Sequence, residues 1–351
     1  MPTPRLSDAL AQQAVDAVAL HGNQTKAASA LGIPRPTLQA RYAAGCDRGL
    51  TPQQRPRRRD PADIPRLTDE VLPTEVLIAR RKEQFAHLKR AKQERLLVPV
   101  RVRLDGPIAI SHFGDPHVDD DGTDIAKIEN HVNIVNATEG MFAANIGDTL
   151  NNWTGRLARL YAEQSTSAAE AWKLGEWFLR SMPWLYVLGG NHGAWSGAGD
   201  PVKWILENCA GLFDNFSVRL GLTFPNGRTV RVNARHDFAG HSMWNTVHGP
   251  LKAATMGWRD HVLTCGHLHT SGYAVLKDPA TGLISHALRV SSYKTFDRYA
   301  HEKGLPNQDI FCNAVTIIDP RYADDDPRLL HVCFDVEQGA DYLTWLRGRK
   351  G

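Results

Sequence analysis

Five short motifs rich in Asp, Asn and His follow one another in the second half of the chain, each at the end of a predicted β-strand. These residue types offer the carboxylate, amide and imidazole donors that bind divalent metal ions. The motifs are GDPH with Asp115 and His117, GDTLNN with Asp148, GGNH with Asn191 and His192, ARHD with His236, and GHLH with His267 and His269. A single His is more often structural than a ligand, so each motif alone is weak evidence. Five in order within one domain predict a metal centre.

This donor set is typical of phosphoester hydrolysis. Water is a poor nucleophile at neutral pH, and two divalent ions roughly 3.5–4 Å apart can share one hydroxide and neutralise charged phosphoryl oxygens. Side chains two apart on a strand point the same way, so Asp115 with His117, and His267 with His269, can each serve one centre. Imidazole and carboxylate donors favour Mn, Fe or Zn over Ca.

The order D-x-H, G-D, G-N-H, H and G-H-x-H, over about residues 105–320, resembles the calcineurin-like metallophosphoesterase superfamily. The resemblance implies an α/β protein with a four-layer α/β/β/α sandwich and two divalent metal ions, Mn²⁺ first, with Fe or Zn as alternatives. It implies that a hydroxide bridging the two ions is the nucleophile. By motif position it also implies these roles: Asp115, His117 and His269 on one ion, Asp148 bridging, Asn191, His236 and His267 on the other, and His192 as the general acid.

Two positions depart from the family pattern. Gly193 stands where the family often has Asp or Glu, and Asn151 stands where an acidic residue often orients the general-acid His. An Asn can hydrogen-bond an imidazole but does not stabilise its charged form as a carboxylate does. We therefore expect His192 to favour substrates with better leaving groups.

Other residues near the motifs have less certain roles. His236 ends a predicted strand and is preferred as the fourth-motif ligand over His241, which follows it in GHS. His112 is expected to be packed rather than to bind metal. Arg156 is a candidate phosphate contact beside Trp153, the alternative being the exposed start of a surface helix.

The first part of the chain differs in charge from the rest. Residues 1–100 hold 17 Lys and Arg against 10 Asp and Glu, whereas the remainder holds 24 against 28. A basic front end favours a polyanionic partner, although solvated charged helices without a partner remain the alternative.

Within residues 1–48 the stretch GNQTKAASALGIPRPTLQARY resembles the Fis-like and resolvase-like helix-turn-helix families. Helices are expected over residues 7–20, 24–31 and 35–43, with Gly32 in the turn between the last two. The resemblance implies a small all-α DNA-binding domain in which Arg35, Thr37 and Arg41 face the major groove. A helical bundle used for protein contacts is the alternative.

Residues 49–73 are rich in Pro and Arg and predict a flexible linker. Residues 74–97 predict a basic connecting helix with a sparse apolar stripe, and a homodimer formed through residues 74–96 is a hypothesis. Residues 98–351 alternate strands and helices, as an α/β catalytic domain should. Expected strands are RVRL, PIAIS, MFAANI, WLYVL, RTVRVNAR, HVLTC and AVTIID.

Composition narrows the setting of the protein. The five cysteines are scattered and form no CxxC pair, which argues against a disulfide framework or a thiolate zinc site. No run of about 18 apolar residues and no signal peptide is present, so we expect a cytoplasmic protein without a membrane partner.

Three functions follow from these patterns. The first is a phosphodiesterase or nuclease acting on DNA, with DNA as substrate or as the target of the helix-turn-helix; the layout also resembles phosphoesterases encoded by phages and prophages. The second is a phosphatase or nucleotide phosphodiesterase that the helix-turn-helix recruits to DNA. The third is an inactive phosphoesterase scaffold that acts as a DNA-binding regulator.

Overall fold

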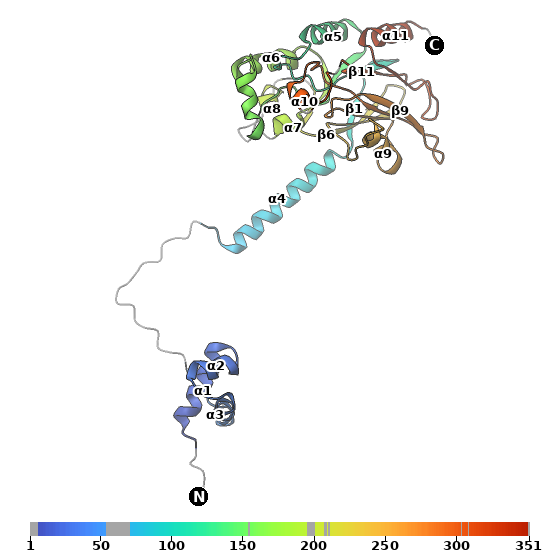
Figure 1. Ribbon diagram of the computed structural model, residues 1–351. Helices are drawn as coiled ribbons and strands as arrows, with labels where there is room; N and C mark the ends of the chain where they lie inside the picture. The colour runs from blue at the N-terminus through green and yellow to red at the C-terminus, as the bar shows by residue number, and fades with distance from the viewer. Residues whose placement is uncertain are drawn as a thin grey trace. The chain divides into compact units, whose positions relative to one another are not determined.

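The computed structural model describes residues 6–53, 71–153, 155–194, 201–206, 209, 211–302, 304–307 and 309–349. The chain divides into two compact units, Met1–Thr74 and Glu75–Gly351 (Figure 1). Most of the predicted linker, residues 54–70, lies outside the described residues.

The first unit contains three short helices, α1 (Asp8–His21), α2 (Gln24–Leu31) and α3 (Arg35–Asp47). The Ser7 side chain accepts from the Leu10 N–H at the start of α1, which satisfies a free donor of the first turn. Gly32 has φ +64° between α2 and α3, a left-handed conformation suited to glycine. The core consists of small residues around Leu38, namely Ala14, Ala17, Ala27 and Ala28. The third helix therefore extends four residues beyond its predicted end.

The second unit contains two mixed six-stranded sheets. One has the order β1-β6-β7-β8-β10-β9 and the other β12-β11-β2-β3-β4-β5. The strands of the first are β1 (Val98–Arg101), β6 (Ser217–Thr223), β7 (Thr229–Arg235), β8 (Val262–Cys265), β9 (Gly272–Lys277) and β10 (Ile284–Arg289). Those of the second are β2 (Ile108–Phe113), β3 (Met141–Asn145), β4 (Trp184–Leu188), β5 (Leu212–Asp214), β11 (Asn313–Ile318) and β12 (Leu330–Cys333).

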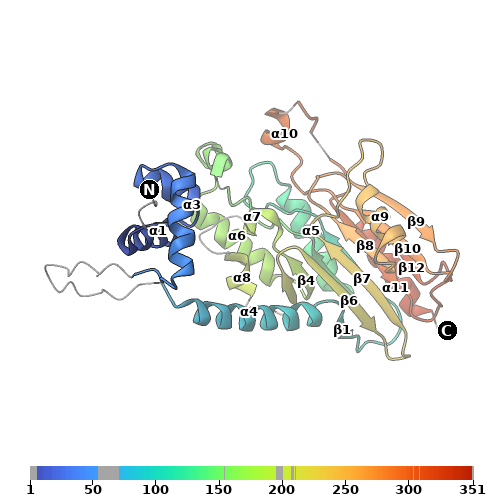
Figure 2. The same cartoon turned by 90° about the horizontal axis from the view of Figure 1, so that it is seen from below.

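Helices cover the outer faces of the sheets (Figures 1 and 2). The helical segments of this unit are α4 (Thr74–Glu94), α5 (Ile125–Ala137), the 3₁₀ segment Gly155–Glu163, α6 (Ala168–Arg180), α7 (Gly190–Ala194), α8 (Pro201–Leu206), α9 (His248–Met256), α10 (Arg298–Glu302) and α11 (Val336–Gly348). In Figure 1, α5 and α11 lie above the strands and α9 lies below them.

Three hydrophobic clusters separate these layers. The first joins α5, α6 and α11 to the sheet that contains β2, through residues such as Val132, Phe178 and Leu343. The second lies between the two sheets and includes Ile110, Tyr186 and Val232. The third packs α9 on Leu263 and Cys265 of β8. The α/β class with two sheets is thus confirmed, with helices on both outer faces.

Parallel pairing brings several strand ends together. β2, β3 and β4 are parallel neighbours in one sheet, and β7, β8 and β10 are parallel neighbours in the other. All five Asp- and His-bearing motifs follow the carboxyl ends of these strands. Loops from several parallel strands converge at such an edge, which is where α/β proteins bind ligands.

The predicted strands match the structure except at the first. The expected strand RVRL is wrong by three residues, because β1 is Val98–Arg101 and pairs in parallel with β6 from Leu220 onward. β1 is an edge strand, and Pro99 is tolerated there because an edge leaves some N–H positions unpaired. None of the helices in the described ranges is long and apolar enough to cross a membrane.

Candidate metal centre

The backbone at the converging strand ends is unusual. Six non-glycine residues in the described part of the chain have positive φ, and four of them are predicted metal ligands: His117, Asp148, His267 and His269. Their φ angles lie between 41° and 69°. Such conformations are uncommon outside glycine and each costs free energy, so they persist only where the surrounding structure holds them.

His236 lies at the middle of one half of the cluster. Its Nδ1 is 3.1 Å from the carbonyl oxygen of Ile146, which fixes this nitrogen as the donor. The other ring nitrogen, Nε2, faces three atoms that could bind a metal ion: Asn191 Oδ1 at 2.8 Å, His267 Nδ1 at 3.1 Å and Asp148 Oδ2 at 3.2 Å. Asp148 and His236, both buried, form a triad with the partly buried His267, and the ligand atoms of the three all lie within 4.8 Å of one another. Four predicted ligands of one ion therefore meet here.

The other half of the cluster contains Asp115, His117 and His269. Asp115 is fully buried, and its Oδ2 accepts the His267 N–H at 2.6 Å and lies 3.7 Å from His269 Nε2. The His117 ring lies edge-on to the ring of His269, with centroids 5.3 Å apart. His117 also forms a second triad with Asp148 and His192 within the same 4.8 Å limit. Asp148 belongs to both triads, the position predicted for a bridging carboxylate.

His192 lies beside Asp148 rather than within the group around His236. Its Nε2 is 3.9 Å from Asp148 Oδ2, and its backbone N–H donates to Asp148 Oδ1 at 3.0 Å. Its Nδ1 donates to the backbone carbonyl of Asn151. The Asn151 side chain instead donates to Asp120 and Gln164, so Asn151 orients His192 through its carbonyl, not its amide.

The electrostatics of the cluster are those of carboxylates and imidazoles sharing a dry site. Burial opposes the charged form of His236, but Asp148 and Asp115 outweigh it and raise its pKa to about 9. Burial would raise the pKa of Asp148, yet His236 and His192 hold it far below its usual range. Burial raises the pKa of Asp115, and burial together with the charge of Lys294 lowers that of His117.

The residues present fit divalent metal ions. Asp115 Oδ1 and both ring nitrogens of His117 are buried without a hydrogen-bond partner among the described residues. Buried polar atoms normally find partners, so these atoms indicate a ligand of another kind. Two glycines make room for the donor side chains, since a Cβ at Gly147 would overlap His236 Nδ1 and a Cβ at Gly190 would overlap Asp148 Oδ1.

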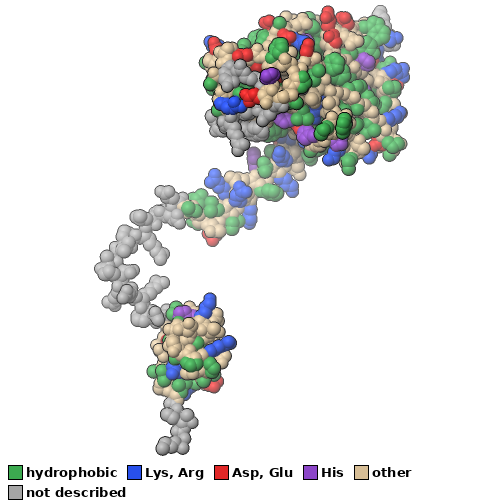
Figure 3. Space-filling view, viewed as in Figure 1, with side chains coloured by type: hydrophobic (Ala, Val, Ile, Leu, Met, Phe, Trp, Pro, Cys, Tyr) green, Lys and Arg blue, Asp and Glu red, His purple; other side chains and the backbone are tan. Residues whose placement is uncertain are grey.

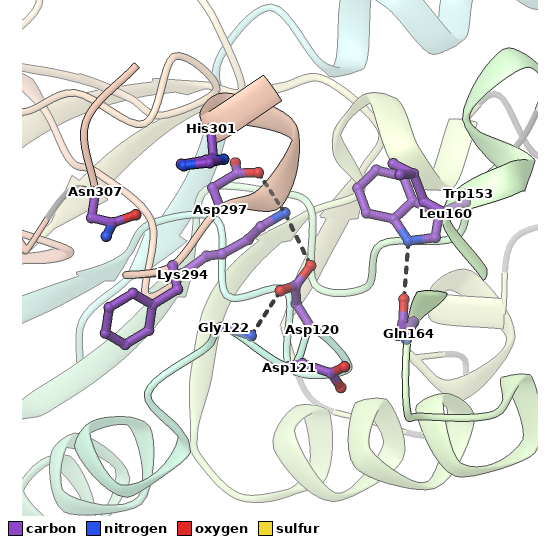
Figure 4. Close-up of a pocket in the computed structure, with 11 residues that line it drawn as sticks. Asp120, Asp121, Gly122, Trp153, Leu160, Gln164, Lys294, Asp297, His301 and Asn307 are labelled. Carbon is purple, nitrogen blue, oxygen red and sulfur yellow. Dashed lines mark hydrogen bonds and ion pairs between the residues drawn. The ribbon is translucent and has the colours of Figure 1, made fainter. Parts of the chain in front are cut away.

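A cavity of about 360 Å³ adjoins the cluster (Figure 4). It is lined by Asp120, Asp121, Gly122, Trp153, Leu160, Gln164, Lys294, Phe296, Asp297, His301 and Asn307. Trp153 is buried, with its ring 5.3 Å from that of His192 and its indole N–H on Gln164 Oε1. Asp297 reaches His269, with Oδ2 3.6 Å from Nδ1. The cavity therefore shares two walls with the candidate centre.

Sequence reasoning missed Lys294 and Asp297. They follow β10, which is parallel to β8 and ends at the same edge of the sheet. The available signal was the polar run SSYKTFD after an apolar segment, but β10 itself was not among the predicted strands.

The remaining predicted residues fall outside the cluster. His241 is exposed and 3.5 Å from Asp237, whereas His112 is buried between Tyr186 and Thr316. The side chain of Arg156 lies outside the described residues. In the first unit Arg35 is exposed on α3, while Thr37 and Arg41 are partly buried.

No protein-family model matches the sequence, and no curated protein matches it.

Proposed function

We propose that the protein is a dinuclear-metal phosphoesterase of the calcineurin-like kind, acting foremost on phosphodiesters. The observation that carries the proposal is the pair of triads that share Asp148 and together hold five side chains, one from each of five strand ends. Structural ion pairs do not need four strained residues and three unpartnered buried atoms in one place. A site that binds divalent cations would account for both features.

The roles of the residues follow from their contacts. Asp115, His117 and His269 would hold one ion, Asn191, His236 and His267 the other, and Asp148 both. Bound divalent ions would acidify water and neutralise phosphoryl oxygens, most readily as Mn²⁺, with Fe or Zn as alternatives. His236 is oriented for this by the Ile146 carbonyl, which keeps its Nε2 available.

His192 would act as the general acid. Its Nδ1 proton is committed to the Asn151 carbonyl, so Nε2 is the atom that exchanges a proton with the leaving oxygen. A neutral carbonyl stabilises the imidazolium less than a carboxylate would. We therefore expect the protein to hydrolyse esters of acidic alcohols faster than esters of poor leaving groups.

The test is hydrolysis of bis-p-nitrophenyl phosphate and p-nitrophenyl phosphate with Mn²⁺, by wild type beside Asp148→Asn and His192→Gln. Diester cleavage that needs Mn²⁺ and is lost in Asp148→Asn supports the proposal. Cleavage of the monoester alone would make the protein a phosphatase. No turnover with Mn²⁺ bound would leave an inactive scaffold as the better account.

DNA is the proposed substrate or target because two features supply cations for it. α3 follows α2 after a tight turn at Gly32, the order expected for a recognition helix, and it exposes Arg35. α4 has no buried residue and exposes Arg80, Arg81, Lys82, Lys89, Arg90 and Lys92 (Figure 3). Phosphate contacts by such residues release counterions, so binding should weaken steeply with salt.

Duplex binding by the full chain at two salt concentrations tests this proposal. Arg35→Ala should weaken binding and reduce the salt slope by about one. Cleavage of labelled single- and double-stranded DNA by the same protein separates a nuclease from an enzyme that DNA only recruits. Unchanged binding in Arg35→Ala with Arg41→Ala would argue against the helix-turn-helix as the DNA contact.

A further inference from the structure

Lys294 is a buried lysine beside the candidate centre. Its side chain is 3% exposed, and its Nζ lies 3.0 Å from Asp120 Oδ2 and 3.3 Å from Asp297 Oδ1 (Figure 4). The same ammonium lies 5.1 Å from the centroid of the Trp153 ring. Lysine is rarely buried unless it is paired, and here two carboxylates and an aromatic face replace water around it.

Asp297 connects Lys294 to His269. One oxygen of Asp297 faces the ammonium, and the other lies 3.6 Å from His269 Nδ1. With the Asp297 carboxylate facing Nδ1 of His269, the other ring nitrogen, Nε2, faces Asp115 and lies 3.7 Å from its Oδ2.

Asp120 connects Lys294 to His192 by a second path. Asp120 Oδ2 contacts the ammonium and also accepts from Asn151 Nδ2 at 2.8 Å. The carbonyl of the same Asn151 accepts from His192 Nδ1. The position of that carbonyl therefore depends on a side chain that Asp120 holds.

The backbone of Lys294 is fixed to the centre as well. Its N–H donates to Ser292 Oγ at 3.0 Å, and that hydroxyl donates to the Asp115 carbonyl at 2.6 Å. Thr123 and Lys294 form an isolated antiparallel β-bridge that joins the two loops. Lys294 is thus linked through intervening groups to His269, His192 and Asp115.

We infer that Lys294 is a positioning residue of the proposed phosphoesterase centre, which fixes the ring orientation of His269 through Asp297 and of His192 through Asp120 and Asn151. The inference rests on the proposed function. The ammonium of Lys294 pairs with Asp120 and Asp297, so we expect it to act on the orientation of the two imidazoles through these carboxylates. Groups behind a metal-binding histidine commonly change metal affinity or activity by about 10–100-fold when they are removed.

A purely structural role is the competing account, and the chain provides a matched control for it. Arg219 pairs with the buried Asp260 at 2.7 Å, beyond the amino end of β8 and away from the cluster. Arg219→Met removes a cation from beside the buried Asp260, and Lys294→Met removes one from beside the partly buried Asp120 and Asp297. Both variants are expected to melt at a lower temperature than wild type.

The experiment compares full-length wild type, Lys294→Met, Lys294→Arg and Arg219→Met below their melting temperatures. Mn²⁺ affinity is measured by calorimetry, and kcat and KM with bis-p-nitrophenyl phosphate. Lys294→Met should bind Mn²⁺ about 10–100-fold more weakly and lose kcat with KM little changed. Lys294→Arg should recover most of both, since the adjoining cavity of about 360 Å³ has room for the guanidinium. Arg219→Met should keep wild-type values.

Ring ¹⁵N spectra of the metal-free proteins make the test independent of the proposed function. Lys294→Met should move the resonances of His269 and His192 and leave those of His112 in place. Wild-type Mn²⁺ affinity and kcat in Lys294→Met, with only a lower melting temperature, would overturn the inference. If wild type binds no Mn²⁺, the proposed function falls, and unmoved His269 and His192 resonances would then overturn this inference too.

Discussion

Two fully buried carboxylates, Asp115 and Asp260, lie toward opposite ends of β8 and have different partners. Asp260 receives Arg219 through both oxygens at 2.7 and 2.8 Å, with Arg231 and Asn233 each at 3.1 Å. Asp115 lies among histidines, with Oδ1 unpartnered among the described residues and Oδ2 on one backbone N–H. The chain thus neutralises Asp260 with guanidinium groups, whereas Asp115 faces only imidazoles, with His236 Nδ1 and His269 Nε2 each 3.7 Å away.

The backbone differs in the same way. Four residues around Asp115 have positive φ, whereas near Asp260 one residue does, Arg259 at 42°. Burying a charge without a close partner costs several kcal/mol, so Asp115 is the carboxylate that a bound cation would stabilise more. The cluster around Asp260 thus stabilises the fold, whereas the cluster around Asp115 is held in place by the rest of the fold.

Replacing the shared carboxylate should have the largest effect. Asp148→Asn removes the one side chain common to both triads, and we expect kcat/KM for the diester to fall at least about 1,000-fold, or about 4 kcal/mol of transition-state stabilisation. Steady-state assays with Mn²⁺ measure it. Asp260→Asn assayed in parallel should keep its activity, and an equal loss in both variants would erase the distinction.

Removing the structural carboxylate should instead cost stability. Asp260→Ala leaves the half-buried Arg219 and Arg231 without their carboxylate, and the free energy of unfolding should fall by about 3 kcal/mol. Urea unfolding followed by circular dichroism measures it. Asp115→Ala is the matched change at the other end and should cost the metal-free protein far less. A larger loss there would mean that Asp115 already has its counter-charge within the chain.

Metal should stabilise the folded protein through the cluster around Asp115 and not through the cluster around Asp260. Mn²⁺ at about 100 times its Kd should add about 2.7 kcal/mol to the free energy of unfolding of wild type and of Arg219→Met. Asp115→Asn should show little of this gain, because the cation loses a charged ligand. Thermal melts with and without EDTA measure the shift. A gain retained in Asp115→Asn would move the metal site elsewhere.

A third buried group, His112, should give the smallest effect, seen as pH dependence. Burial lowers its pKa to about 3, whereas an unfolded histidine titrates near 6.5. The unfolded chain therefore binds more protons, and the stability from neutral His112 is complete above pH 6.5 and lost as pH falls from about 6.5 toward 3. His112→Gln should lessen the drop in urea midpoint between pH 7.5 and 4.5.

Part of that drop should remain in His112→Gln, because burial also lowers the pKa values of His131 and His286, each to about 4. An undiminished drop would show that His112 is not kept neutral by the fold.

The sequence predicted the elements whose pattern is local. The three N-terminal helices have side-chain caps or a glycine stop, β2, β3, β4, β8 and β11 are mainly apolar runs, and β7 alternates apolar and polar residues. β6 and β10 were not among the predicted strands. Arg289 ends β10 and is 1% exposed, and its partners are the Thr246 and Gly266 carbonyls and Asp237. These partners are more than 20 residues away in the sequence, so no local pattern predicts them.

The candidate site divides in the same manner. The donors in short motifs at strand ends could be listed from spacing, and the structure brings all eight of those side chains to one edge. The orientation of the histidines could not. It depends on Asp297, Lys294 and Asp120, which come from separate loops, and on a carbonyl of Asn151 where a side chain was expected.

Gly190 has a consequence for the evolution of such proteins. It has φ +77°, and any side chain there would enter the space of the Asp148 carboxylate. One codon change, Gly190→Ala, is thus expected to silence the centre while every donor residue stays in the sequence. A lineage could lose the activity in this way and still carry an intact set of ligands, so the glycines within the motifs, more than the histidines, would record when selection for activity ended.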